Sequence, residues 1–399
     1  MHTQAKTAVY TERKTCRACE RSGLRDVLSL GNQYLANFVR MKDPNLPRAP
    51  LDLVRCDVCG LLQLKHMVDP DLMWREYWYR SSVNQTMRDA LVDVVLDGQK
   101  YAKEGVWLDI GANDGYLLSR VPERFTKIAC EPALNMQSLL EEHADKIIPD
   151  YFTAERFLEQ QDDADVITSC AMFYDLNDPD RFVQDIARCL SPEGIWINQL
   201  ADAPTMMRRN AFDSICHEHA CYYDVASLHA MYLRHGLHII NIRHNTINGG
   251  SVRVTAAKAR GTGSSPLLGV AETQEQDVVA FADRVRRWKS LAMDLLDLPA
   301  VRSSELWGLG ASTKGCALLQ YLGSDQVVAI GDRNPSKAGT LMAGTWTPVF
   351  DEATMRKAKP KYVIPLVWGF RDEILQREAS MRAEGAVFLF PLPNMEFVL

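Results

Sequence analysis

Apolar runs alternate with helically spaced segments through the middle of the chain. Four short runs, at 106–110, 127–131, 165–170 and 194–200, are almost wholly apolar, and the segments between them place apolar residues three and four apart. Continuous apolar runs of this length are typical of parallel strands that are covered on both faces. The pattern predicts an α/β fold with a Rossmann-like parallel sheet.

Two regions with other patterns flank this α/β segment. The N-terminal region is rich in cysteine and turn residues, whereas a Gly/Ser cluster at 260–266 predicts a linker. Helical spacing over 272–298 leads into a second alternation of strands and helices that begins near residue 303. We therefore expect three domains: an N-terminal module over 1–75, a central α/β domain over 76–262 and a smaller C-terminal Rossmann-like α/β domain over 263–399.

Composition narrows the class of protein. The net charge of -6 gives no general attraction to nucleic acid or to an anionic membrane. The first residues lack the apolar core of a signal peptide, and we find no apolar run of about 18 residues, the length that a membrane helix needs. We therefore expect a cytoplasmic protein, a monomer or small homo-oligomer, without nucleic-acid or membrane partners.

Paired cysteines in the N-terminal region predict a metal site. Cys16 and Cys19 form one CxxC pair, and Cys56 and Cys59 form a second, with Gly60 directly after it. Two such turns supply four thiolates, which complete a tetrahedral shell for Zn²⁺ and leave no open position for catalysis. We expect a structural zinc ion, with the long segment between the pairs looping out.

A glycine loop follows the first strand of the central region. The strand at 106–110 contains Asp109 and runs into Gly111-Ala-Asn-Asp-Gly115, so that Gly111, Asn113 and Asp114 lie where a ligand can approach the backbone. Glu131 ends the next strand, where a carboxylate suits the ribose hydroxyls of an adenosine. The loop resembles that of class I S-adenosyl-L-methionine (SAM)-dependent methyltransferases, which implies SAM as the cofactor.

Residues 210–223 combine several groups that suit proton transfer. His219 fits the role of a base near neutrality, the neighbouring Glu218 and His217 can support it, and Tyr222 can hold an enolate oxygen. The HExH spacing is not the HExxH of zinc proteases. The cluster therefore predicts a site that removes an acidic proton from carbon.

Two downstream segments predict substrate contacts. The turn at 245–253 offers Asn248 and Arg253, which could hold hydroxyls or phosphates. The strand-to-helix turn at 306–315 offers Ser312, Thr313 and Lys314 beside a helix N-terminus, an arrangement that suits a pyrophosphate. Arg333 follows the next strand, where a nucleotide-binding unit places its ribose contacts.

Taken together, these motifs resemble the three-domain SAM-dependent sugar C-methyltransferases, such as the dTDP-3-keto-deoxysugar C-3-methyltransferases. The resemblance covers almost the whole chain, from the four cysteines to the terminal Pro-Leu-Pro, and includes FDxIxHEHxxYY and GxGASTKG. It implies a nucleotide-diphosphate sugar held between the central and C-terminal domains, with His219 beside the carbon to be methylated. It also implies contacts from residues outside the motifs above: Tyr79, Ser82 and Asn177 with substrate, and Ala171 and Met172 with SAM.

The chain departs from the family pattern at two places. Cys216 stands where the family often has a tyrosine with a proposed role in proton transfer, and a thiol is a poor hydrogen-bond donor. Gly369 stands between Trp368 and Phe370, where a polar residue is more usual. Either His219 acts as the base by itself, or Tyr222 substitutes for the missing phenol, or the substrate differs.

The sequence thus predicts SAM-dependent C-methylation of a nucleotide-linked keto-deoxysugar, through an enolate formed at the carbon next to the ketone. An O- or N-methyltransferase acting on a related small molecule is the alternative within the same class. A non-catalytic binding protein, and an oxidoreductase with NAD in the C-terminal unit, are alternatives from other classes. The absence of GxGxxG weakens the NAD interpretation.

Overall fold

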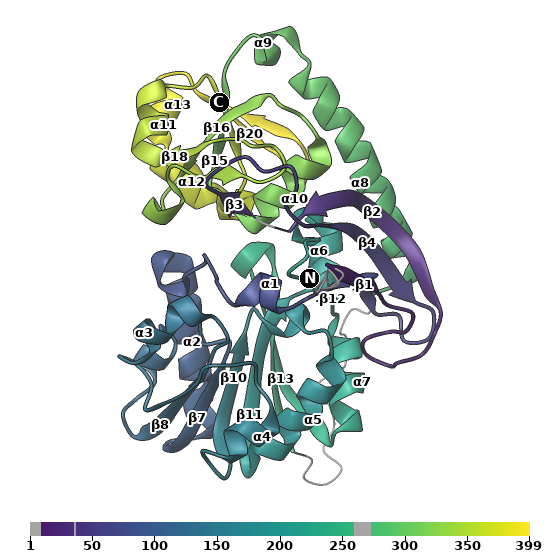
Figure 1. Cartoon of the computed structure of the whole chain (residues 1–399), viewed down its shortest axis with the longest axis vertical. Helices are drawn as coiled ribbons and strands as arrows, with labels where there is room; N and C mark the ends of the chain where they lie inside the picture. The colour runs from purple at the N-terminus through teal and green to yellow at the C-terminus, as the bar shows by residue number, and fades with distance from the viewer. Residues whose placement is uncertain (1–8, 36, 259–272) are drawn as a thin grey trace, which may run out of the picture.

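The computed structural model describes residues 9–35, 37–258 and 273–399. Figure 1 shows a blue and teal lobe that contains the central sheet, a green and yellow C-terminal lobe, and purple N-terminal strands beside the junction of the two. The predicted linker at 260–266, and with it the expected boundary at residue 262, lies outside the described residues.

The central lobe is built on a seven-stranded sheet in the order β13-β14-β11-β10-β7-β8-β9. All neighbours are parallel except at β14, which is antiparallel to both β11 and β13. The strand order reverses between β7 and β10, and ligands of open α/β sheets bind at such a switch point. The strands are β7 (Gly105–Ile110), β8 (Phe125–Cys130), β9 (Lys146–Ile148), β10 (Ala164–Cys170), β11 (Leu190–Ala201), β13 (Leu237–Asn245) and β14 (Ser251–Lys258).

Helices cover both faces of this sheet because successive strand residues point to opposite sides. On β7, Trp107 packs with Leu91 and Val94 of α2 (Gln85–Tyr101), whereas Leu108 belongs to the core that includes α5 (Pro179–Cys189) and α7 (Val225–Arg234). The apolar character of both faces explains the continuous apolar runs in the sequence. The Rossmann-like prediction is confirmed.

The segment after Gly115 does not form the helix that its apolar spacing predicts. It contains turns and a single 3-10 turn, η2 (Leu118–Arg120). Pro122 follows closely and disfavours helical backbone at the residue before it, so that the segment is too short to propagate a helix.

The N-terminal strands form a four-stranded antiparallel sheet in the order β12-β5-β4-β2. The segment between the two cysteine pairs is a long hairpin, because β2 and β4 pair along most of their length. One edge strand, β12, comes from the central region. The strands are β2 (Leu24–Tyr34), β4 (Arg48–Cys56), β5 (Leu62–Leu64) and β12 (Cys221–Tyr222); β1 (Tyr10–Glu12) pairs with β6 (His66–Val68), and β3 (Phe38–Val39) pairs with β17 (Leu341–Met342).

The C-terminal lobe contains a six-stranded sheet in the order β18-β16-β15-β19-β20-β21, parallel except for β21. The helical segment over 371–383 is interrupted at Glu378, whose side chain is 1% exposed and is held by Arg356 and Arg377. The strands are β15 (Leu306–Leu309), β16 (Val327–Asp332), β18 (Val349–Asp351), β19 (Tyr362–Pro365), β20 (Val387–Phe390) and β21 (Glu396–Val398). The helices from residue 273 onward are α8 (Glu275–Leu296), α9 (Pro299–Arg302), α10 (Thr313–Leu322), α11 (Glu352–Ala358), α12 (Arg371–Arg377) and α13 (Ala379–Ala383).

One apolar core joins the lobes. Leu53 of β4, Phe212 of η5 (Phe212–Ser214) and Trp288 of α8 belong to the same buried cluster as the C-terminal sheet. The remaining α-helices are α1 (Asp71–Trp74), α3 (Gln137–Leu140), α4 (Ala154–Leu158) and α6 (Ala203–Arg208). Among the described residues, no helix is both long and apolar enough to cross a membrane.

Candidate functional site

A cavity of about 730 Å³ opens at the carboxyl ends of the central strands and extends to the N-terminus of α10. Its walls come from all three parts of the chain: Asn37 precedes β3, Gly111 follows β7, and Thr313 begins α10. The sequence-predicted site residues that line it are Tyr79, Asp109, Gly111, Asn113, Glu131, Ala171, Met172, Asn177, Glu218, His219, Asn248, Ser312, Thr313, Lys314 and Arg333.

The central-sheet end of the cavity is shaped by residues with positive φ. Gly111 has φ 71°, Asn113 has φ 53° and Ala171, just after β10, has φ 56°. A Cβ on Gly111 would lie 3.1 Å from the Met172 side chain. Glycine is therefore required at this turn, because a larger residue would be strained and would press on Met172.

Two carboxylates stand at this end of the cavity. Asp109 accepts a hydrogen bond from Thr168 Oγ1 at 2.7 Å, and burial raises the pKa of Asp109 to about 7. Glu131 accepts the backbone N–H groups of Asn113 and Ala133, both at 2.8 Å. Each oxygen of Glu131 accepts one bond and can accept another, so that a pair of ribose hydroxyls can still bind.

His219 lies on the cavity wall between this end and α10. Its Nδ1 is 2.7 Å from the Ser214 carbonyl oxygen. A carbonyl only accepts, so in the neutral ring Nδ1 carries the hydrogen and Nε2 keeps its lone pair. Burial and the nearby charge of Lys314 lower the pKa of His219 to about 3. The ring packs edge-on to Tyr174, with centroids 4.4 Å apart.

Glu218 joins the three parts of the chain at the cavity. Its Oε1 accepts hydrogen bonds from Asn37 Nδ2 at 3.0 Å and from Thr313 Oγ1 at 3.1 Å. Asn37 also donates to Thr313 Oγ1 at 3.2 Å. Burial raises the pKa of Glu218, and these hydrogen bonds oppose the rise.

The turn from β15 into α10 forms the opposite end of the cavity. Gly310 has φ 84°, and a Cβ there would lie 2.5 Å from Val367. Ser312 caps α10 by accepting the N–H of Gly315 at 3.0 Å, and Lys314 Nζ donates to the Asn248 carbonyl at 3.2 Å. The first-turn N–H groups of α10, the Ser312 hydroxyl hydrogen and Lys314 together suit an anionic group.

The structure does not bring Arg253 to the cavity, where the sequence predicts a substrate contact. Its side chain is 2% exposed and does not line the cavity. It donates to Asp97 at 2.5 Å, to Asp93 at 2.8 Å and to Gln199 at 2.9 Å. These bonds tie β14 to α2, so that Arg253 has a structural role there.

Four other predicted residues also lie off the cavity wall. His217 points to the N-terminal sheet, with Nε2 2.9 Å from the Ala49 carbonyl oxygen. Tyr222 donates at 3.4 Å to the Ser214 carbonyl, the same group that holds His219 Nδ1. Ser82 and Asp114 bind each other, because the Ser82 N–H donates to Asp114 at 2.9 Å. The predicted contact of Tyr222 with an enolate oxygen is therefore not supported.

The cavity also contains residues that the sequence analysis did not assign. Tyr77 lies two residues before the predicted Tyr79, and the others come from the segments 171–179 and 210–223 and from Trp368, where the sequence indicated a site without showing which side chains turn inward. These residues are Tyr77, Tyr174, Asp175, Asp213, Cys216 and Trp368. Asp175 is notable because burial and the charge of Glu218 raise its pKa well above the usual range.

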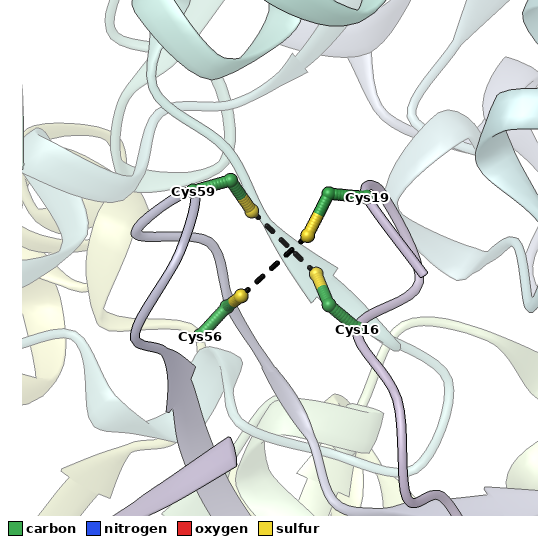
Figure 2. Close-up of side chains that lie close together, drawn as sticks. All are labelled: Cys16, Cys19, Cys56 and Cys59. Atoms are coloured by element: carbon green, nitrogen blue, oxygen red, sulfur yellow. Dashed lines mark hydrogen bonds between the residues drawn. The ribbon is translucent and has the colours of Figure 1, made fainter. Parts of the chain in front are cut away.

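The four N-terminal cysteines form the predicted metal site. Figure 2 shows their sulfur atoms turned toward a common centre, and all four lie within 4.8 Å of one another. The Sγ atoms of Cys16 and Cys59 are 3.6 Å apart, and those of Cys19 and Cys56 are 3.7 Å apart. Zn–S bonds of about 2.3 Å in a tetrahedron require separations of about 3.8 Å, so the residues fit a structural zinc ion.

Comparison with known proteins identifies each part of the chain. Residues 16–74 match a putative zinc binding domain, residues 79–242 a methyltransferase domain and residues 246–393 a C-methyltransferase C-terminal domain. The last match begins before β14, although this strand belongs to the central sheet.

One curated relative covers nearly the full length. The chain is 27% identical to the C-methyltransferase NovU of Streptomyces niveus, with 95% of each chain covered. Solved structures with similar regions include the N-methyltransferase NodS of Bradyrhizobium japonicum, with 10% identity, 45% of this chain and 99% of that chain covered and a TM-score of 0.36. A SAM-dependent methyltransferase from Clostridium acetobutylicum has 11% identity, coverage of 43% and 91%, and a TM-score of 0.34.

The zinc-binding module, the methyltransferase domain and the C-terminal domain thus follow one another in this chain, which aligns with a C-methyltransferase over nearly its full length. SAM is the methyl donor, and the zinc ion is structural. The chain is a SAM-dependent C-methyltransferase with a zinc-binding module before its methyltransferase domain and a C-methyltransferase C-terminal domain after it.

Proposed function

We propose that the protein methylates a nucleotide-linked keto-deoxysugar on the carbon next to its ketone, through an enolate formed by His219. The observation that carries this proposal is the place of His219, whose ring lines the cavity between the glycine loop after β7 and the N-terminus of α10. No described residue hydrogen-bonds Nε2, so its lone pair is available to a substrate. The resemblance to sugar C-methyltransferases supports the same substrate class.

The α10 end of the cavity suits the diphosphate of the substrate. A helix N-terminus favours negative charge, and Lys314 adds a full positive charge there. Arg333 also lines the cavity, and its side chain donates to Glu373 at 2.6 Å. Because this ion pair already engages the guanidinium, we assign Arg333 to the nucleotide end of the substrate and not to the reacting sugar. Tyr79 and Asn177 also line the cavity.

Binding of the diphosphate also strengthens the base. The charge of Lys314 is one of the two causes that lower the pKa of His219, and a paired phosphate offsets that charge. His219 Nε2 then accepts the proton from carbon while Nδ1–H stays bonded to the Ser214 carbonyl. Asn248, which lines the cavity beside Lys314, is the candidate donor to the enolate oxygen.

SAM, when bound at Asp109, Gly111, Asn113 and Glu131, supplies an electrophilic methyl carbon. The protein's own contribution is to align the enolate carbon with that methyl group and to exclude water. Both tasks suit a cavity enclosed by all three parts of the chain.

The test is to incubate the protein with a dTDP-linked 4-keto-6-deoxyhexose and SAM carrying a ¹³C-labelled methyl group, and to locate the label by NMR. The proposal expects a methyl group bonded to the carbon next to the ketone. A label on oxygen or nitrogen would show the alternative, an O- or N-methyltransferase, and would overturn the enolate mechanism.

A further inference from the structure

A buried carboxylate oxygen without a partner lies at the cavity. Asp213 of η5 is 1% exposed and lines the cavity wall. Its Oδ2 accepts the indole N–H of Trp368 at 2.7 Å, whereas its Oδ1 is buried and has no hydrogen-bond partner among the described residues. Buried carboxylate oxygens are normally paired, so this atom is suited to a donor that arrives with a ligand.

The orientation of Asp213 is fixed from the C-terminal lobe. Trp368 belongs to η8 (Trp368–Phe370), and its ring lies against Gly249 of η6 (Ile247–Gly249), where a Cβ would be 3.6 Å from the indole. The indole is thus packed against one element and bonded to another. The free oxygen of Asp213 is therefore preorganised rather than free to rotate.

The neighbours of Asp213 show which part of a ligand it meets. The positive charge of Lys314 acts on the pKa values of both Asp213 and His219. The residue after Asp213 is Ser214, whose carbonyl holds His219 Nδ1. Asp213 therefore lies next in sequence to the residue that holds the base, and the charge of Lys314 at α10 acts on its carboxylate.

We propose that Asp213 is a specificity-determining residue, which accepts a hydrogen bond from a hydroxyl on the sugar carbon between the diphosphate-bearing carbon and the methylated carbon. This inference rests on the proposed function, which places the diphosphate at Lys314 and the reacting carbon at His219. For methylation at C3 the group is the C2 hydroxyl. A sugar without that hydroxyl leaves Oδ1 buried and unpaired, and the site discriminates against it.

The test compares two probes by isothermal titration calorimetry in the presence of S-adenosylhomocysteine: a dTDP-linked 4-keto-6-deoxyhexose with the C2 hydroxyl, and its 2-deoxy counterpart. The parent protein is expected to bind the hydroxylated probe about 10- to 100-fold more tightly, as a hydrogen bond to a charged group allows. Asp213→Asn keeps an acceptor for Trp368 but replaces the free carboxylate oxygen with an amide N–H₂. We expect this ratio of affinities to fall at least about tenfold in the variant.

Asp202→Asn is the matched control. Asp202 is also buried, at 2% exposure, but it caps α6 through the Thr205 N–H at 3.0 Å and does not line the cavity. This variant should keep the parent's ratio. Thermal unfolding is followed in both variants, because a purely structural role for Asp213 would lower the melting temperature without changing the ratio.

The outcomes separate this inference from the proposed function. Suppose that the parent protein methylates the hydroxylated probe, but that Asp213→Asn leaves the ratio of the two affinities unchanged. This result would overturn the role of Asp213 and leave the proposed function standing. A parent protein that binds neither probe would overturn the proposed function, and the inference would fall with it.

Discussion

At the scale of single residues, the site depends on an imidazole that stays neutral. His219 is buried beside a lysine, and both conditions penalise the imidazolium, so its pKa falls to about 3. The hydrogen bond to Ser214 opposes this shift but does not cancel it. The lone pair on Nε2 is therefore present throughout the physiological pH range, and an anion paired with Lys314, as we propose for the substrate, would increase the basicity of Nε2.

The first prediction concerns pH. Because the base must be unprotonated and its pKa in the free enzyme is lowered, kcat/KM should stay level as the pH falls from 7 to about 5, and not decline around the ordinary histidine value of about 6.5. A kcat/KM profile over this range checks it. An acid limb with a midpoint near 6.5, in protein that circular dichroism shows to be folded, would contradict the assignment.

The same shifts bear on stability. His217 has a pKa lowered to about 4 by burial, so between this value and about 6.5 the unfolded chain binds more protons than the folded one. His217 and His219, whose pKa values are both lowered, therefore make folding less favourable as the pH falls through that window. The folded-state check in the kcat/KM measurement is needed for this reason.

Residue types could be read from the sequence better than side-chain directions. Of the HEH cluster, Glu218 and His219 line the cavity, whereas His217 contacts the Ala49 carbonyl of β4. Arg253 suits a phosphate in sequence, yet Asp97 and Asp93 of α2 bind it in the fold. Asp213 can be recognised as a candidate site residue only from the structure, which shows its hydrogen bond with Trp368, 155 residues away in the sequence.

At the scale of elements, two strand-to-helix turns shape the two ends of the cavity. Gly111 after β7 and Gly310 after β15 both have positive φ, and in both cases a Cβ would press on a neighbouring side chain. The glycine patterns were visible in the sequence because this turn geometry demands glycine. The 3-10 turn after Gly115 and the break at Glu378 could not be read from the sequence. Apolar spacing favours a helix in both segments, but Pro122 prevents it in the first, and the buried ion pairs of Glu378 interrupt it in the second.

A second prediction tests the turn at α10. Gly310→Ala places a Cβ 2.5 Å from Val367 at a φ of 84°, so the N-terminus of α10 must shift. We expect KM for the sugar nucleotide to rise about tenfold or more, since a 1.4 kcal/mol loss of binding already gives this factor, while the SAM affinity stays unchanged. Steady-state kinetics and SAM calorimetry measure the two effects.

Gly323→Ala is the matched control for this turn. Gly323 caps the other end of α10 with φ 70°, but a Cβ there meets nothing within 4 Å. It carries a similar backbone strain of about 1–2 kcal/mol. Equal effects of the two substitutions on KM would mean that strain in α10, and not displacement of its N-terminus, is responsible.

At the scale of the whole molecule, the parts of the chain interlock through very short strands. β12 from the central region extends the N-terminal sheet, and β3 from the N-terminal region pairs with β17 of the C-terminal lobe. Pairings of two residues leave no periodic pattern in a sequence, so this interlocking was not predicted. Its consequence is that Asn37 reaches the cavity and bonds Glu218 and Thr313.

A third prediction follows from that junction. Asn37→Asp keeps the shape of the side chain but replaces its donor N–H₂ with a second carboxyl oxygen facing Glu218. We expect kcat to fall by about tenfold or more through loss of alignment, with SAM affinity unchanged. Asn45→Asp, at an exposed position of the same region, is the control and should behave as the parent. Parent-like kcat in Asn37→Asp would mean that the junction does not affect catalysis.

The central claim is that His219 removes a proton from carbon. The most direct measurement is solvent-deuterium exchange into the dTDP-linked 4-keto-6-deoxyhexose, followed by mass spectrometry without SAM, for the parent protein and for His219→Asn. Asparagine can still donate to Ser214 but has no group equivalent to Nε2. We expect rapid exchange next to the ketone with the parent protein, and a rate about 10²- to 10⁴-fold lower with the variant. Exchange at the parent's rate in His219→Asn would contradict it.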